Sequence, residues 1–230
     1  MARKSSQSRS SPGQPLSAAS SGALPSAARP ATLEIYDTTL RDGAQAEDVS
    51  FSAEDKVRVA QQLDGLGVQF IEGGWPGANP KDIEFFRMIK TVPLQTATVV
   101  AFGATRKSSN AVQKDPNIRA LLEAETTIIT LFGKTWSLHV TDALGISLAK
   151  NLELISDSVA HLRSKGRRVF YDAEHFFDGY KTNPDYALET IRHAVAAGAE
   201  RVILCDTNGG SMPWEIKDIC RIVRRECAVP

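Results

Sequence analysis

Short β-branched and apolar runs alternate six times with amphipathic stretches from Ala31 onward. Six strand–helix units in succession predict a parallel sheet, because parallel neighbours are joined by long, usually helical, crossovers. The runs expected as strands are Thr32–Tyr36, Gln69–Glu72, Thr96–Phe102, Thr126–Phe132, Arg168–Ala173 and Arg201–Cys205. This rhythm leaves two architectures, an open doubly wound sheet and a (β/α)8 barrel.

Helix boundaries are visible between the expected strands. Ser52 followed by Asp55 resembles a capping box that opens a helix. Asn183 before Pro184 is typical of a helix N-cap and first turn, and Gly198 is typical of a helix stop.

The barrel is the better of the two architectures. No GxGxxG sequence follows the first expected strand, which weighs against the dinucleotide-binding form of the open sheet. A complete barrel typically needs about 250 residues, whereas residues 32–230 supply roughly 200 and stop where a seventh strand would be due. We therefore predict an α/β fold, a (β/α)8 TIM barrel truncated after about six βα units, over residues 32–230.

Residues 1–31 differ in composition from the rest of the chain. They are rich in Ser, Ala and Pro, with four basic residues and no acid. Such a segment has too little apolar surface to offset its ordering entropy, so we expect a disordered tail. The same composition is typical of an organelle transit peptide, which stays open as an alternative to a cytoplasmic location.

Charge and hydropathy exclude two classes of partner. The net charge is zero, whereas a nucleic-acid-binding protein usually shows a basic excess. No apolar run is long enough to cross a bilayer. The three cysteines show no CxxC spacing, which fits a reducing cytosol.

Polar residues gather where each expected strand ends. In parallel α/β folds these ends and the loops after them face the ligand. The segments are 37–43, 72–77, 103–106, 133–136, 172–180 and 206–210, and each carries an acid, a lysine or, in the third, Arg106. A rim of acids with basic residues suits a hard divalent cation and an anionic, oxygen-rich substrate.

Four of these segments carry a family resemblance. Asp37–Gln45 (DTTLRDGAQ) resembles the signature of the DRE-type TIM-barrel metallolyase superfamily. Ile71–Asp82 (IEGGWPGANPKD), Asp172–Lys181 (DAEHFFDGYK) and Leu204–Gly210 (LCDTNGG) are similar to its citramalate synthase branch, whose sister is the 2-isopropylmalate synthase branch. The resemblance covers the chain from about residue 32 to its end.

The resemblance implies an acyltransferase that condenses acetyl-CoA with pyruvate to give citramalate, on the route to isoleucine. It implies that Asp42 binds Mg²⁺ or Mn²⁺, that Arg41 binds substrate and steadies the developing oxyanion, and that Glu174 takes part in proton transfer. Thr207 would contact the 2-oxo acid carboxylate. Glu72 is placed with the substrate-binding residues, with a structural role at the barrel mouth as the alternative.

The chain departs from the family pattern after its sixth unit. The family's other metal ligands are a His-x-His pair on the seventh strand, expected within about ten residues beyond Pro230, and an asparagine on the eighth strand. The chain alone is therefore expected to be inactive, and the full-length form is expected to be a homodimer. The open alternatives are a 2-isopropylmalate synthase acting on 2-oxoisovalerate, a hydroxyacyl-CoA lyase and an inactive truncated fragment.

Other residues of the rim receive structural interpretations. Asp37 is expected to accept structural hydrogen bonds, and Asp206 either supports the metal site or caps its turn. Trp75 and Trp136 are attributed to packing, as are the three cysteines.

Overall fold

The structure is a computed structural model in which residues 33–229 are described, so the tail expected to be disordered lies outside it. Six parallel strands form one sheet, and each pairs with the next in chain order. The strands are β1 (Tyr36–Asp37), β2 (Phe70–Gly74), β3 (Thr98–Ala104), β4 (Ile128–Lys134), β5 (Arg168–Glu174) and β6 (Arg201–Leu204).

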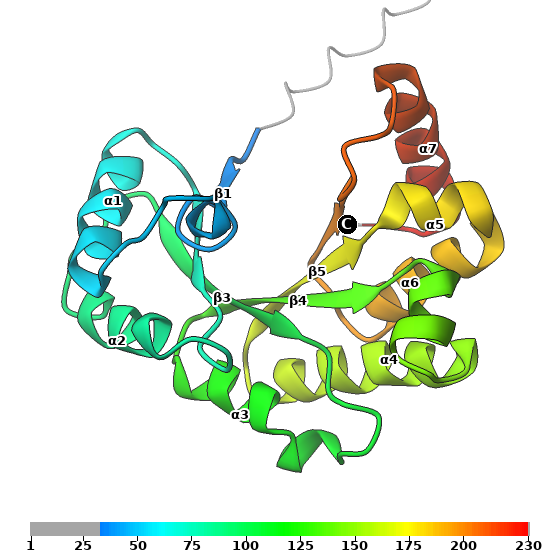
Figure 1. Cartoon of the computed structure of the whole chain (residues 1–230), viewed down its shortest axis with the longest axis horizontal. Helices are drawn as coiled ribbons and strands as arrows, with labels where there is room; N and C mark the ends of the chain where they lie inside the picture. Colours follow the sequence, from blue (N-terminus) through cyan, green and yellow to red (C-terminus); the bar gives the residue numbers. More distant parts are fainter. Residues whose placement is uncertain (1–32, 230) are drawn as a thin grey trace, which may run out of the picture. The chain divides into compact units, whose positions relative to one another are not determined.

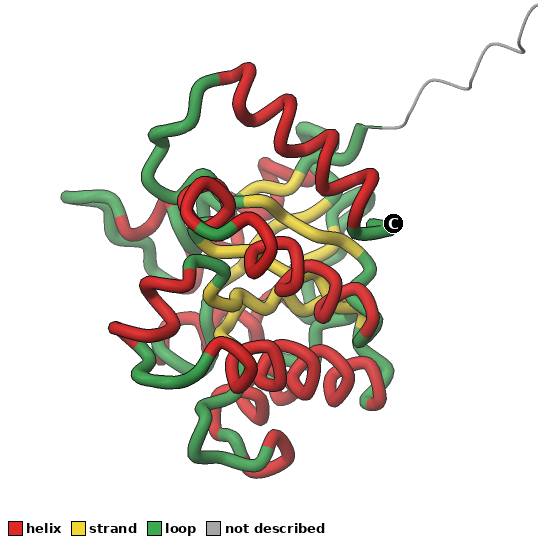
Figure 2. Tube along the Cα trace, turned by 90° about the vertical axis from the view of Figure 1, so that its right-hand side faces the viewer, coloured by secondary structure: helices red, strands yellow, loops and turns green. Residues whose placement is uncertain are grey.

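Helices connect the strands and cover one face of the sheet, which curls away from them (Figure 1). In the view turned by 90°, the strands lie behind a layer of helices (Figure 2). The helices are α1 (Ala53–Gly65), α2 (Pro80–Ile89), α3 (Pro116–Glu123), α4 (Leu148–Ser164), α5 (Phe176–Thr182), α6 (Pro184–Ala196) and α7 (Pro213–Glu226), with short turns η1 (Gly43–Gln45), η2 (Val112–Lys114) and η3 (His139–Ala143). The prediction of six barrel-type βα units is confirmed.

The expected helix boundaries are also confirmed. Ser52 and Asp55 form a reciprocal capping box at the start of α1. The Asn183 side chain accepts from the Tyr186 amide at the start of α6, with Pro184 as the first helical residue. Each cap satisfies backbone donors that the first helical turn leaves free.

Most strands begin within two residues of their expected positions, and the start of β3 has a clear cause. The Asp64 carboxylate at the end of α1 accepts hydrogen bonds from the amides of Gln95, Thr96 and Ala97 at 2.7–3.1 Å. Those amides cannot pair with β2, so the strand begins at Thr98 rather than Thr96.

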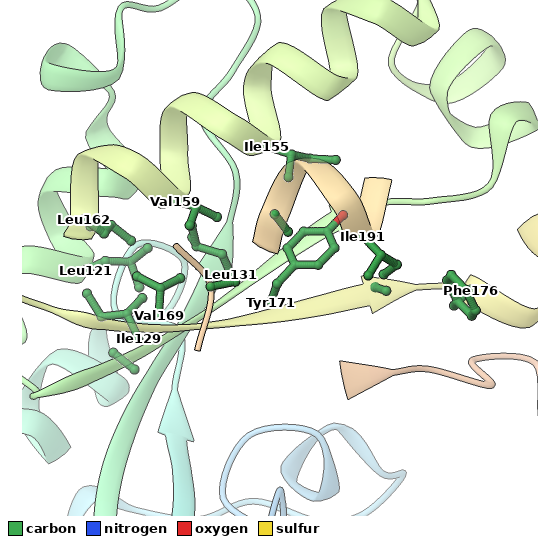
Figure 3. Close-up of a cluster of buried hydrophobic side chains, with 14 of the residues drawn as sticks. Leu121, Ile129, Leu131, Ile155, Val159, Leu162, Val169, Tyr171, Phe176 and Ile191 are labelled. Atoms are coloured by element: carbon green, nitrogen blue, oxygen red, sulfur yellow. The ribbon is translucent and has the colours of Figure 1, made fainter. Parts of the chain in front are cut away.

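Alternating side chains on the strands make two cores. The outward face packs against the helices, as Figure 3 shows for Leu131 and Tyr171 of the sheet beneath Ile155 of α4. The inward face starts with an apolar layer of Phe70, Val100, Ile128 and Phe170, packed by Tyr36 and Ile203. Side chains on one face recur at every second residue, so the next inward positions are the polar Glu72, Thr130 and Asp172 and, on β3, Phe102.

Candidate active site

A cavity of about 530 Å³ opens above the inward apolar layer, at the carboxyl ends of the strands. Of the five residues that the sequence assigns to catalysis, substrate binding or the metal, four line this cavity, and the fifth, Glu72, lies just beneath it. The lining residues are Arg41, Asp42, Gln45, Trp75, Phe102, Phe132, Asp172, Glu174, Cys205, Asp206 and Thr207.

The loop after β1 is shaped by its own polar groups. The Asp37 carboxylate accepts from the Thr39 amide at 3.0 Å and from the Thr39 hydroxyl at 3.1 Å, which confirms its structural role. The Thr38 carbonyl accepts from the amides of Arg41 and Gly43, both at 3.1 Å. This tight turn carries Arg41 and the residue after it to the cavity.

Arg41 is held from below by a buried hydrogen-bond network. Its Nε donates to Glu72 Oε1 at 2.5 Å, and its guanidinium lies 3.8 Å from the centre of the Phe102 ring. The Tyr36 hydroxyl lies 2.5 Å from Glu72 Oε2 and 2.7 Å from the Thr130 hydroxyl. Glu72 is 1% exposed, and each of its two oxygens accepts a hydrogen bond from a protein donor.

Burial has the largest effect on the pKa values of Glu72 and Tyr36 in this network. It raises the pKa of Glu72, while the charge of Arg41 and the hydrogen bond from Tyr36 act in the opposite direction. Burial also raises the pKa of Tyr36, and the neighbouring Glu72 charge adds to that effect. The Tyr36 hydroxyl therefore stays a donor at neutral pH, and Glu72 lies beneath the cavity with its two oxygens turned to Tyr36 and Arg41.

Asp42 presents the accessible carboxylate of the pair. Its side chain is 63% exposed, and its Oδ1 lies 3.1 Å from Arg41 Nη1. A carboxylate at the mouth of a polar cavity is a suitable oxygen ligand for Mg²⁺ or Mn²⁺. Between residues 33 and 229, however, no three His, Cys, Asp or Glu side chains converge as a metal site would need. The accessible carboxylate of Asp42 is therefore a candidate for one ligand of such a cation.

Two further carboxylates line the opposite wall, both on β5. Glu174 Oε2 lies 2.5 Å from Lys134 Nζ on β4. Asp172 Oδ1 accepts from the Cys205 thiol at 2.7 Å, and burial raises the pKa of Asp172 and of Cys205. Asp172 was not singled out from the sequence. Cys205, which was attributed to packing, also lines the cavity.

Thr207 reaches the cavity from the loop after β6. Its Oγ1 accepts a hydrogen bond from the backbone amide of His175 at 2.9 Å. With that acceptor position filled, the hydroxyl hydrogen is free to donate to an anionic group in the cavity. His175 adopts a left-handed conformation with φ of 52°, and its Nδ1 lies 3.1 Å from Asp178 Oδ2. Such conformations are costly outside glycine and cluster at functional sites.

An aromatic wall closes the side of the cavity near Arg41. The rings of Phe102 and Phe132 stack with centroids 5.2 Å apart. Trp75 packs edge-on against both, at 6.0 and 5.4 Å. Packing was therefore the correct expectation for Trp75, but this packing forms a wall of the cavity.

The structure resolves two other interpretations of the rim. Arg106 does not face the ligand side: it is 5% exposed and its guanidinium pairs with Asp157 and Glu153 of α4 at 2.6–3.0 Å. Asp206 caps its turn, since its two oxygens accept from the amide and the hydroxyl of Ser211, both at 3.0 Å.

A curled parallel sheet with helices on its outer face and an arginine- and carboxylate-lined cavity at its carboxyl ends defines an enzyme-type α/β barrel domain. The HMGL-like family model matches residues 32–230, and the chain belongs to that family.

Sequence comparison with named proteins shows which members of the family the chain resembles. The chain is 54% identical over 198 residues to the (R)-citramalate synthase of Geobacter sulfurreducens, covering 86% of this chain and 38% of that protein. It is 55% identical over 199 residues to the (R)-citramalate synthase of a Synechocystis strain, covering 86% and 36%. The 2-isopropylmalate synthase of Solidesulfovibrio magneticus is 32% identical over 187 residues, covering 81% and 35%. The chain therefore spans little more than a third of the curated relatives it matches.

Solved structures agree on the fold. The hydroxymethylglutaryl-CoA lyase of Pseudomonas aeruginosa has a TM-score of 0.67 at 22% identity, covering 84% of this chain and 64% of that one. The HMG-CoA lyase of Brucella melitensis has a TM-score of 0.66 at 17% identity, covering 84% and 69%. No helix within residues 33–229 is long and apolar enough to cross a membrane.

Proposed function

We propose that residues 32–230 form the greater part of the catalytic barrel of an acyltransferase that condenses acetyl-CoA with pyruvate to give citramalate. The observation that carries the proposal is the shared Arg41 guanidinium, which bridges buried Glu72 and exposed Asp42 at the mouth of the cavity. The 54–55% identity to (R)-citramalate synthases supports this chemistry. The homodimer and the cytoplasmic location remain predictions.

The proposed substrates are anionic, and the cavity supplies matching donors. Arg41 would bind the keto oxygen on which negative charge develops, because a guanidinium stabilises an oxyanion strongly in a partly buried site. Thr207 would donate its hydroxyl hydrogen to the 2-oxo acid carboxylate. Glu72 would act through Arg41, as a residue that orients it.

A divalent cation would be held by Asp42 from this part of the chain. When bound, such a cation supplies Lewis-acid polarisation of a carbonyl group. The expected His-x-His pair and asparagine would provide the remaining protein ligands.

Proton transfer would fall to Glu174. Its carboxylate would accept a proton from the methyl group of acetyl-CoA, and the resulting carbon nucleophile would attack the pyruvate keto carbon to give an alkoxide. Glu174 would return the proton to that alkoxide, and water would then cleave the thioester to release CoA and citramalate. Lys134 lies 2.5 Å from Glu174 and keeps the carboxylate oriented between the two substrates.

Pyruvate is the preferred 2-oxo acid in this proposal, with 2-oxoisovalerate as the alternative. Identity to 2-isopropylmalate synthases is 32–34%, well below the 54–55% to citramalate synthases. The aromatic wall of Trp75, Phe102 and Phe132 also narrows the cavity beside Arg41.

A chimeric protein tests the proposal directly. Residues 32–230 would replace the matching 198 residues of the Geobacter sulfurreducens relative, so that the remainder of that enzyme completes the barrel. We expect pyruvate-dependent release of CoA from acetyl-CoA, measured with a thiol reagent, and citramalate detected by mass spectrometry. The 230-residue chain alone should release none.

Two controls sharpen the outcome. The Asp42→Asn chimera should fold but lose most CoA release, because a neutral amide oxygen binds a hard cation more weakly than a carboxylate does. A chimera with native circular dichroism that releases no CoA with pyruvate would overturn the proposal. Faster release with 2-oxoisovalerate than with pyruvate would support the 2-isopropylmalate synthase alternative.

A further inference from the structure

A lysine and an aspartate that do not line the candidate active-site cavity are buried together. Lys56 on α1 and Asp82 on α2 are each 4% exposed and form an ion pair. Lys56 Nζ also donates to the Gly73 carbonyl at 3.1 Å, so it links both helices to the end of β2. Burying two charges is expensive, and such a pair rarely stabilises more than an apolar alternative would. Stability of the fold alone therefore does not explain why this ion pair is buried here.

The pair forms hydrogen bonds with the backbone of the loop that carries Trp75. Asp82 Oδ2 accepts from the Trp75 amide at 2.8 Å. Gly74, the residue before Trp75, has a φ of 148°. A Cβ on Gly74 would lie 2.4 Å from Asp82 Cγ, so the backbone of the loop packs directly against the carboxylate. The strand register shifts at this point, between Glu72 and Gly74.

Trp75 is fixed at its other end as well. Its indole Nε1 donates to Asn117 Oδ1 at 2.7 Å, and Asn117 Nδ2 donates to the Ala104 carbonyl at 2.5 Å. The ring then packs edge-on against Phe132 and Phe102, the ring beneath Arg41. A continuous set of contacts thus runs from the buried ion pair to the cavity.

We propose that Lys56 and Asp82 are positioning residues that hold Trp75 as the fixed wall of the cavity. The ion pair defines where the backbone of Trp75 lies, and the indole hydrogen bond defines its tilt. What this wall does for substrate binding rests on the proposed function, but the position of the indole can be measured without any substrate.

Hydrogen exchange on the 230-residue chain gives the first measurement. The Trp75 amide should exchange at least roughly tenfold more slowly than the exposed Gly77 amide, because it donates to a buried charged acceptor. Equal exchange at the two amides would overturn the proposal, and this comparison needs no substitution.

Fluorescence quenching gives the second measurement. In the Trp136→Phe/Trp214→Phe background, Trp75 is the one tryptophan of the chain. Asp82→Ala should then raise the acrylamide quenching constant at least about twofold and speed Trp75 amide exchange at least about tenfold. Asp82→Asn, which keeps one acceptor oxygen but loses the ion pair with Lys56, should restore only part of both properties.

Asp185→Ala is the matched control, since Asp185 also lies in the first turn of a proline-initiated helix and contacts no part of this loop. It should leave Trp75 unchanged. A folded Asp82→Ala chain with Trp75 as shielded and as slowly exchanging as in the parent would overturn the positioning role. That failure is separate from a failure of citramalate formation in the chimera.

Discussion

Replacing Arg41 by lysine separates charge from geometry at the cavity. The guanidinium donates through Nε to Glu72 and through Nη1 to Asp42, while its plane lies 3.8 Å from the Phe102 centroid. Among the described residues Nη2 has no hydrogen-bond partner, which leaves it for a ligand. A lysine ammonium is one compact group, so it can reach Glu72 or a substrate oxygen but cannot bridge them at this spacing.

The expected magnitude follows from the loss of one oriented donor to a developing oxyanion. Such a loss typically lowers kcat by about 10²–10³-fold, equivalent to about 3–4 kcal/mol. In the chimera, steady-state CoA release with pyruvate and acetyl-CoA would measure it. Arg58→Lys is the matched control, because Arg58 is exposed on α1 and pairs, within residues 33–229, only with Asp55 at 3.4 Å.

The refuting result is simple to recognise. If Arg41→Lys retained more than about a tenth of the parent kcat, the fork geometry would contribute little and a positive charge alone would suffice. The assignment of Glu72 as the residue that orients Arg41 would then fail too.

Three further predictions concern stability and reactivity. Asp115→Asn should cost about 3 kcal/mol, or roughly 6–12 °C in Tm, because the carboxylate accepts four hydrogen bonds and the amide would turn its NH₂ toward two of those donors. Burial opposes ionisation of Asp115, but those hydrogen bonds outweigh it and lower its pKa, so in urea titrations the cost should be full at pH 7 and shrink as pH falls through the lowered pKa. Gly74→Ala should destabilise the fold by about 3 kcal/mol, since its Cβ would meet Asp82, and a urea midpoint equal to that of the parent would contradict the geometry. Cys205 should resist iodoacetamide at pH 8 in the folded chain and react in urea, because burial raises its pKa; mass spectrometry of the labelled peptides reads this out.

The strands and the loop after β1 could be predicted because their signals are local. Apolar runs define the strands, and the family resemblance of Asp37–Gln45, a continuous stretch of sequence, points to Arg41 and Asp42. The inward partners Tyr36, Thr130 and Asp172 were missed, although counting back by two from Glu174 leads to Asp172 on the same face of β5. That alternation was a usable signal, whereas the hydrogen bond from Cys205 to Asp172 depends on the register between two strands.

Arg106 shows why a position at a strand end is insufficient. It follows β3 at the expected edge, yet its guanidinium turns outward to Glu153 and Asp157, which lie 47 and 51 residues later in the chain. A basic side chain goes where its desolvation is best compensated, and two acids on α4 outweigh a place at the cavity. Nothing local to residues 103–106 identifies those partners.

The asymmetry around Arg41 is the feature that makes the cavity chemically useful. One of its carboxylate partners, Glu72, is buried and accepts from two protein donors, whereas the other, Asp42, has a side chain that is 63% exposed and that accepts, among the described residues, only from Arg41. If both were buried, no carboxylate beside Arg41 would be accessible to a cation. If both were exposed, the guanidinium would be mobile and poorly oriented for an oxyanion. Division of the two carboxylates between support and ligand binding therefore follows from the fold itself, since Glu72 points inward from β2 and Asp42 comes from the turn after β1.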